Sequence, residues 1–82
     1  SMLLDMGLVG MCIMLLATEK GLGTCAMIST VMYPEVLKRE LPIPEDHIVA
    51  YALAMGYPDM SHPLNCFHRE REDTAGLCTW VR

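Results

Sequence analysis

The most constraining feature of the sequence is an apolar stretch near its start, with no charged side chain from Met6 to Thr18. Residues 3–20 therefore predict a helix that is apolar on nearly every side, and such a helix has to be buried on more than one side. Gly7 and Gly10 each weaken a helix by about 1 kcal/mol relative to alanine. We expect these two glycines to mark a close helix–helix contact.

The predicted helix ends at the segment GLGTC, residues 21–25. Gly21 stands where many helices place a residue with positive φ, and Lys20 before it lies favourably at the negative end of the helix dipole. From the residues alone, two interpretations stay open. Either Gly21 caps the helix and Gly23 fills a loop, or the missing Cβ atoms let a ligand approach the backbone closely.

The composition predicts that this chain does not stand alone. Of its 82 residues, 52% are hydrophobic and only 20% are charged, whereas a monomer of this size buries only roughly 60–65% of its extended surface. We therefore expect the chain to oligomerise or to pack against a partner segment. Its net charge of −4 gives no general attraction to nucleic acid or anionic lipid, so neither is an expected partner.

Cysteine usage and the apolar run both favour a cytoplasmic protein. The run at residues 6–18 is shorter than the ~20 residues of a membrane span and lacks the basic flank of a signal peptide. The four cysteines include no CxxC pair, which favours free thiols in a reducing compartment, with Cys12 buried in the helix. His62, Cys66 and His68 lack the paired spacing typical of zinc sites, so no metal is expected.

The order of the remaining segments predicts an α+β fold. Proline and glycine residues, which interrupt regular secondary structure, divide the chain after the first helix into short segments. We predict a short strand or buried connection at 25–32, a second helix at 33–41, a loop at 56–63 and an extended tail at 65–82. Residues 47–55 predict a strand covered on both faces, with a short buried helix as the alternative that periodicity leaves open. One or two strands do not make a stable sheet, so another chain or segment is expected to complete it.

Several ordered motifs together resemble the C-terminal part of the nitroreductase family, the FMN-dependent NAD(P)H oxidoreductases. The motifs are DMG near the start of the apolar helix, GLGTC at its end, YPEVLKREL followed by PIPED, then IVAYALAMGYPD and HPLNCFHRERE. The resemblance implies a homodimer with FMN at the subunit interface. It also implies hydride transfer from NAD(P)H through the flavin to a nitroaromatic or quinone-like acceptor. Residues 2–82 are interpreted as a single partial domain of this kind, and Ser1 as a cloning scar.

The resemblance also implies which residues contact FMN. In relatives the glycine-rich turn after the long helix lies beside the flavin and contributes backbone contacts. This makes Gly21, Leu22, Gly23 and Thr24 the candidate contacts here, with the simple helix cap as the alternative. No catalytic side chain is expected, because the cofactor performs the chemistry.

Two arginines in the string HRERE are the candidate phosphate ligands. Arg71 matches the basic residue that pairs with the FMN phosphate in relatives, and its guanidinium can bond two phosphate oxygens at once. Arg69 is a second candidate, offset by one from the other basic position of the family, which falls on His68. The alternative is a solvated polar tail with weak ion pairs.

These 82 residues contain no counterpart of the Arg-x-Ser-x-Arg segment that makes many of the contacts to FMN in relatives. Two hypotheses are therefore carried forward. In the first, the chain is an element of an FMN-dependent oxidoreductase. In the second, it is a truncated relative that self-associates without flavin and has no catalytic activity.

Overall fold

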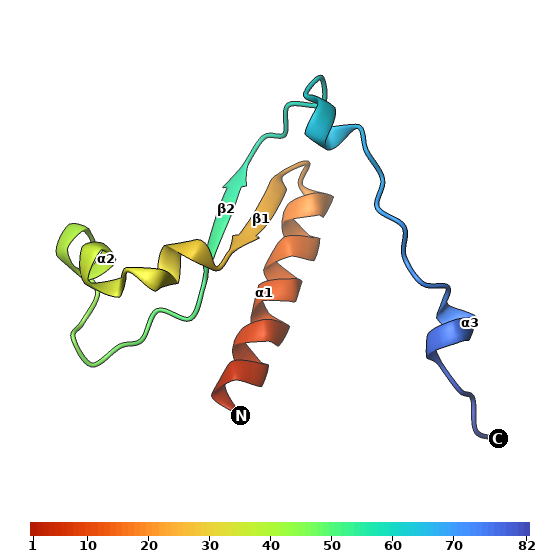
Figure 1. Cartoon of the computed structure of the whole chain (residues 1–82), viewed down its shortest axis with the longest axis horizontal. Coiled ribbons are helices and arrows are strands. Elements are labelled where there is room, and N and C mark those ends of the chain that lie inside the picture. The colour runs from red at the N-terminus through yellow and green to blue at the C-terminus, as the bar shows by residue number, and fades with distance from the viewer.

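The computed structural model describes all residues from 1 to 82 and contains helices and strands in the predicted α+β order (Figure 1). Short 3-10 turns lie at Ser29–Met32 and Pro63–Asn65. The principal elements are α1 (Met2–Glu19), β1 (Gly23–Met27), α2 (Pro34–Glu40), β2 (Ala52–Gly56) and α3 (Thr74–Leu77).

The C-terminal end of α1 is closed by a Schellman motif, as the glycine after it predicts. The Gly21 amide donates to the carbonyl of Thr18 at 3.0 Å, and Gly21 adopts φ 77°, which turns the next amide back toward the helix. The Leu22 amide donates to the carbonyl of Ala17 at 2.8 Å. These two bonds satisfy carbonyls that the helix would otherwise leave unpaired at its end. The predicted helix and its cap at Gly21 are confirmed.

The two strands form one antiparallel pair, in the order β1-β2. Gly23 lies opposite Gly56, and Met27 opposite Ala52. The prediction of a strand from residue 47 covered on both faces is wrong in two respects. Residues before Ala52 are outside β2, and Met55 within the strand is exposed. With only β1 beside it and α1 on one face, nothing in this chain covers the other face of β2 (Figure 1).

The helix α1 packs against this strand pair through a narrow line of small residues. Gly10 and Ala17 are the only buried residues of the chain, and their separation by two helical turns places them on one face of α1. The hydroxyl of Tyr51, just before β2, donates to the carbonyl of Met6 at 2.8 Å. A Cβ on Gly10 would meet this hydroxyl and lie 3.0 Å from Tyr51 Cζ.

The glycines of α1 therefore do not form the predicted helix–helix contact. Gly10 makes room for the ring of Tyr51, while a Cβ on Gly7 would meet no atom within 4 Å. The tyrosine reaches the helix from the extended segment before β2. An aromatic side chain, and not a second helix, thus explains the glycine in the middle of α1.

Most apolar surface stays uncovered, in line with the composition. The accessible surface is 7626 Å², against roughly 4,900 Å² for a compact protein of this mass. The radius of gyration is 16.8 Å, against roughly 12 Å for a compact chain of this length. Cys12, expected to be buried, is exposed, because the side of α1 away from the strands has nothing packed on it (Figure 1).

By length and composition, α1 could cross a membrane. The argument that the apolar run is too short therefore does not hold for the helix as formed, which has 18 residues. The buried core helix of a soluble protein meets the same criteria, so length and composition alone do not choose between the two environments.

The chain after the second 3-10 turn leaves the rest of the molecule as an arm (Figure 1). It is extended apart from the single turn of α3, which confirms the predicted extended tail. All its residues are exposed, including Trp80 at 79% and Val81 at 93%. Nothing within this chain covers the apolar end of the arm.

The packing at α1 predicts opposite effects for its two glycines. Gly10→Ala should lower the free energy of unfolding by about 1–2 kcal/mol, because the added methyl displaces the Tyr51 ring and breaks its hydrogen bond. Gly7→Ala is the matched control and should raise that free energy by about 0.5–1 kcal/mol, because its methyl meets open space. Denaturant titration measures both, and equal stabilisation by the two variants would contradict the contact.

The helix cap predicts a second pair of variants. Gly21→Ala should lower the free energy of unfolding by about 1–2 kcal/mol, because a Cβ disfavours positive φ. Gly21→Asn should cost less, since asparagine tolerates this conformation better than other residues with a side chain. The same titration compares them, and an alanine variant as stable as the native chain would rule out the cap.

Candidate functional site

The glycine-rich turn joins α1 to β1 and brings the four candidate backbone contacts to one end of the strand pair. Gly21 and Leu22 lie in the helix cap, and their amides already donate to helix carbonyls. Gly23 and Thr24 are the first two residues of β1. A ligand at this turn can therefore meet the carbonyls of Gly21 and Leu22 and the half-buried side chain of Leu22, but not the two amides.

A shallow hollow of about 280 Å³ lies at this end of the strand pair. Two of the predicted contacts, Gly23 and Thr24, line it. The opposite wall comes from the end of β2 and the segment after it, because the register places Gly56 across from Gly23. The full lining is Gly23, Thr24, Cys25, Ala54, Met55, Gly56, Tyr57, Pro58 and Asn65.

Gly23 has a close neighbour within the chain. A Cβ at this position would lie 3.3 Å from Cβ of Pro58 and 3.7 Å from the carbonyl oxygen of Gly56. The first distance is tighter than an ordinary van der Waals contact, so the ring of Pro58 depends on the bare backbone of Gly23. Gly23 is therefore a strand residue in close packing and not filler in a loop.

The segment after Pro58 forms a turn held by its own polar groups, which we call the Asp59–Cys66 turn. One carboxylate oxygen of Asp59 accepts from the amide of Ser61 at 3.0 Å and from its hydroxyl at 2.6 Å. The carbonyl of Asp59 accepts from the His62 amide at 3.2 Å and from the side-chain amide of Asn65 at 2.6 Å. Two side chains, Asp59 and Asn65, thus close the turn.

The bonds from Ser61 favour the ionised form of Asp59. They lower the pKa of its carboxyl below the ordinary value for an aspartate, with the hydroxyl as the largest cause and the Ser61 amide next. Because the folded pKa is lowered, these bonds contribute at neutral pH and are lost only when the pH falls through that lowered pKa.

The two candidate phosphate ligands lie away from the hollow. Arg69 and Arg71 are in the extended stretch between the Asp59–Cys66 turn and α3, and both are exposed. Neither takes part in an ion pair or a side-chain hydrogen bond. Within one copy of the chain they do not line the hollow beside Gly23 and Thr24.

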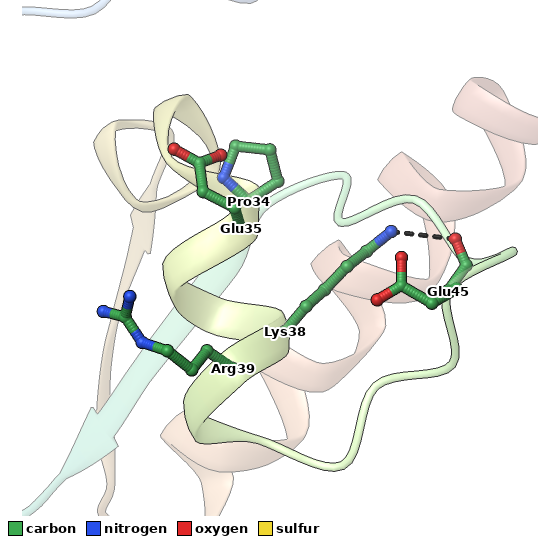
Figure 2. A pocket seen from close by; sticks show the side chains of 5 residues that line it. All are labelled: Pro34, Glu35, Lys38, Arg39 and Glu45. Carbon is green, nitrogen blue, oxygen red and sulfur yellow. Dashed lines mark hydrogen bonds between the residues drawn. The ribbon is translucent and has the colours of Figure 1, made fainter.

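A second hollow, of about 360 Å³, lies beside α2 and is lined only by polar residues and a proline (Figure 2). Lys38 extends across it to donate to the carbonyl of Glu45 at 2.9 Å. Arg39 points the other way and pairs with its neighbour Glu40 at 3.3 Å. Because the two cations do not converge and carboxylates stand nearby, this hollow does not provide an anion site.

Asn65 and Pro58 are site residues that reasoning from the sequence missed. The sequence places Pro58 in a predicted loop and in the motif GYPD, but it assigns neither Pro58 nor Asn65 a role in the site. The available signal was the position of GYPD directly after a predicted strand, since a strand pair brings the residues following one strand beside those preceding the other. The pairing of Gly23 with Gly56 realises this geometry.

Comparison with known proteins agrees with the motifs. The sequence model of the nitroreductase family matches residues 1–57. A nitrobenzene nitroreductase from Ectopseudomonas oleovorans is 40% identical over 69 residues, which cover 84% of this chain and 30% of that protein. A 4-nitrobenzoate reductase from Nocardioides sp. (strain LMS-CY) is 32% identical over 82 residues, covering 98% of this chain and 33% of that protein.

A 4-nitrobenzoate reductase from Pseudomonas putida is 29% identical over 74 residues, covering 90% of this chain and 33% of its own length. No solved structure matches the chain. The chain spans about a third of the length of the curated relatives it matches. Since the family match extends over more than half of its residues, the chain belongs to the nitroreductase family.

Proposed function

We propose that these residues are the C-terminal portion of an FMN-dependent NAD(P)H oxidoreductase that reduces nitroaromatic compounds. The observation that carries this proposal is the glycine-rich turn of a nitroreductase-family chain opening onto the hollow beside Gly23 and Thr24. The acceptor class follows the relatives, which are reductases of nitrobenzene and 4-nitrobenzoate. When bound, FMN would accept hydride from NAD(P)H and pass it to the acceptor.

The residues of this chain fit part of an FMN site. Gly23 and Thr24 present backbone at the edge of the hollow, where a flat ring can approach. The guanidinium groups of Arg69 and Arg71 are free of protein partners, as a phosphate site requires. The chain supplies contacts to the flavin, and its role is binding and orientation.

We further propose that the protein acts as a homodimer in the cytoplasm. The exposed apolar side of α1 and the free arm ending at Trp80 supply more uncovered apolar surface than a monomer of this size tolerates. A second subunit that covers part of this surface would also bring a second arm close to the first copy. Arg69 and Arg71 would then approach a flavin that their own subunit does not reach.

A second candidate is a self-associating protein that binds no flavin. This candidate is favoured because the amides of Gly21 and Leu22 already donate to helix carbonyls and are not free to bind a flavin. It is also favoured because Arg69 and Arg71 do not line the hollow within one copy of the chain. The same exposed surface would then serve assembly alone.

Flavin content tests the proposed function. The purified protein should be yellow, or become so with added FMN, and its visible absorbance should survive gel filtration. Arg71→Ala should weaken FMN binding about tenfold, because one charge-assisted bond to phosphate is worth about 1.5 kcal/mol. Arg39→Ala, an exposed arginine of α2, is the control and should leave affinity unchanged. Colourless protein that takes up no FMN would favour the flavin-free candidate.

Mass in solution tests assembly separately. Light scattering should give a mass of at least two subunits at micromolar concentration, because the exposed apolar surface favours association. A mass of one subunit would contradict the homodimer, whatever the flavin content.

A further inference from the structure

An apolar hollow, which we call the N-terminal hollow, lies at the end of α1 opposite to the glycine-rich turn. It has a volume of about 280 Å³, and it is the only hollow of the chain lined mainly by apolar residues. The first turns of α1 form one wall, and the segment before β2 forms the other. The lining consists of Met2, Leu3, Met6, Asp46, His47, Ile48 and Ala50.

Nothing in the chain covers the walls of the N-terminal hollow. Leu3 is 72% exposed and Ile48 is 83% exposed. A cavity of roughly 150 Å³ already holds a benzene ring, so this hollow has room for one large aromatic side chain. The thioethers of Met2 and Met6 are favourable neighbours for such a ring. The hollow therefore fits an aromatic group that the chain around it does not supply.

The largest side chain of the protein is also uncovered. Trp80, the only tryptophan, is 79% exposed near the end of the arm. Covering an indole removes roughly 150–250 Å² from water. The arm leads away from the rest of its own copy (Figure 1), and Trp80 does not line the N-terminal hollow of that copy. A second copy of the chain is therefore the partner that can bring an indole to it.

The charges beside the indole and beside the hollow are complementary. Arg82 follows Trp80 by two residues in an extended stretch, so both side chains lie on the same side of the arm. Arg82 has no ion-pair partner in its own chain. Asp46 lines the hollow with a side chain that is 87% exposed, and its carboxylate bonds only to the neighbouring ring of His47. An indole in the hollow would thus bring a guanidinium to an accessible carboxylate.

The length of the arm suits this contact together with the proposed flavin contacts. From Arg71 to Trp80 the arm extends about 24 Å, at about 3.3 Å per extended residue and 1.5 Å per helical residue. From Leu3 to Glu19, between the N-terminal hollow and the glycine-rich turn, α1 rises about 24 Å. One arm can therefore reach both ends of α1 in the same partner.

We propose that Trp80 of one copy binds in the N-terminal hollow of a second copy, where Arg82 pairs with Asp46. Most homodimers have two-fold symmetry, so each dimer would contain two such contacts. The inference rests on the homodimer of the proposed function and adds the residues that join its subunits. Two indoles bury less area than a stable dimer needs, so the exposed side of α1 contributes the rest of the interface.

The test follows the fluorescence of Trp80, which is the only indole of the chain. In a dilution series of the full chain, its emission should move to shorter wavelength as light scattering shows association, because the indole leaves water. Met6→Glu and Ile48→Glu each put a carboxylate into the hollow. Each should keep the emission at the long wavelength of an exposed indole and raise the dimer dissociation constant about tenfold.

Met32→Glu is the matched control for these variants. Met32 is 69% exposed and lines none of the hollows, so this variant should behave as the native protein. Circular dichroism checks that every variant keeps its secondary structure.

A charge exchange tests the ion pair. Asp46→Arg and Arg82→Asp should each raise the dimer dissociation constant about tenfold, since a symmetric dimer contains two of these pairs. The variant that combines both changes should return to the native value. A role of either residue within its own subunit would give no such rescue, and absence of rescue would remove the ion pair from the interface.

The outcomes separate this contact from the proposals on which it rests. A mass of one subunit at every concentration would overturn the homodimer and this contact with it. A dimer whose Trp80 emission stays at long wavelength, or shifts equally in both glutamate variants, would overturn the contact alone. Short-wavelength emission from single subunits would place the indole on its own copy and also refute it. The readout is the position of the emission, so it decides independently of whether FMN binds.

Discussion

The fold depends on the approach of Tyr51 to α1 at Gly10. The hydroxyl bonded to the Met6 carbonyl and the ring over the bare glycine join the helix to the strand that follows 45 residues later. Ala17, two turns along the same face, is the other buried residue. Because no larger core exists within the chain, this small contact decides how α1 lies against β1 and β2.

The position of the candidate site follows from that contact. With α1 fixed on the strand pair, its capped end directs the glycine-rich turn into β1, and the register brings Gly56 and the segment after it opposite Gly23. The hollow forms where these two backbones meet. The arginine arm is outside this arrangement, and within one copy of the chain Arg69 and Arg71 do not line the hollow.

Local sequence patterns predict where most helices and strands lie, but they do not predict which elements pack against one another. The apolar run, Gly21 and Pro34 mark helix boundaries because each acts through its own backbone conformation. The strand predicted from His47 is too long and too buried compared with β2. An apolar run indicates that burial of its side chains is favourable, but it does not show whether the same chain contains residues that pack on them. For the same reason, Gly7 and Gly10 looked equivalent until the ring of Tyr51 distinguished them.

The sequence by itself determined the family, the long helix and its glycine stop, and the need to cover more apolar surface than the chain can bury. These properties are local or additive, so composition and motif order are enough to establish them. Only the tertiary structure decided that Pro58 rests on Gly23, that Asn65 joins the hollow, and that Arg69 and Arg71 do not. Such contacts depend on the path of the backbone between distant residues, and no local pattern records that path.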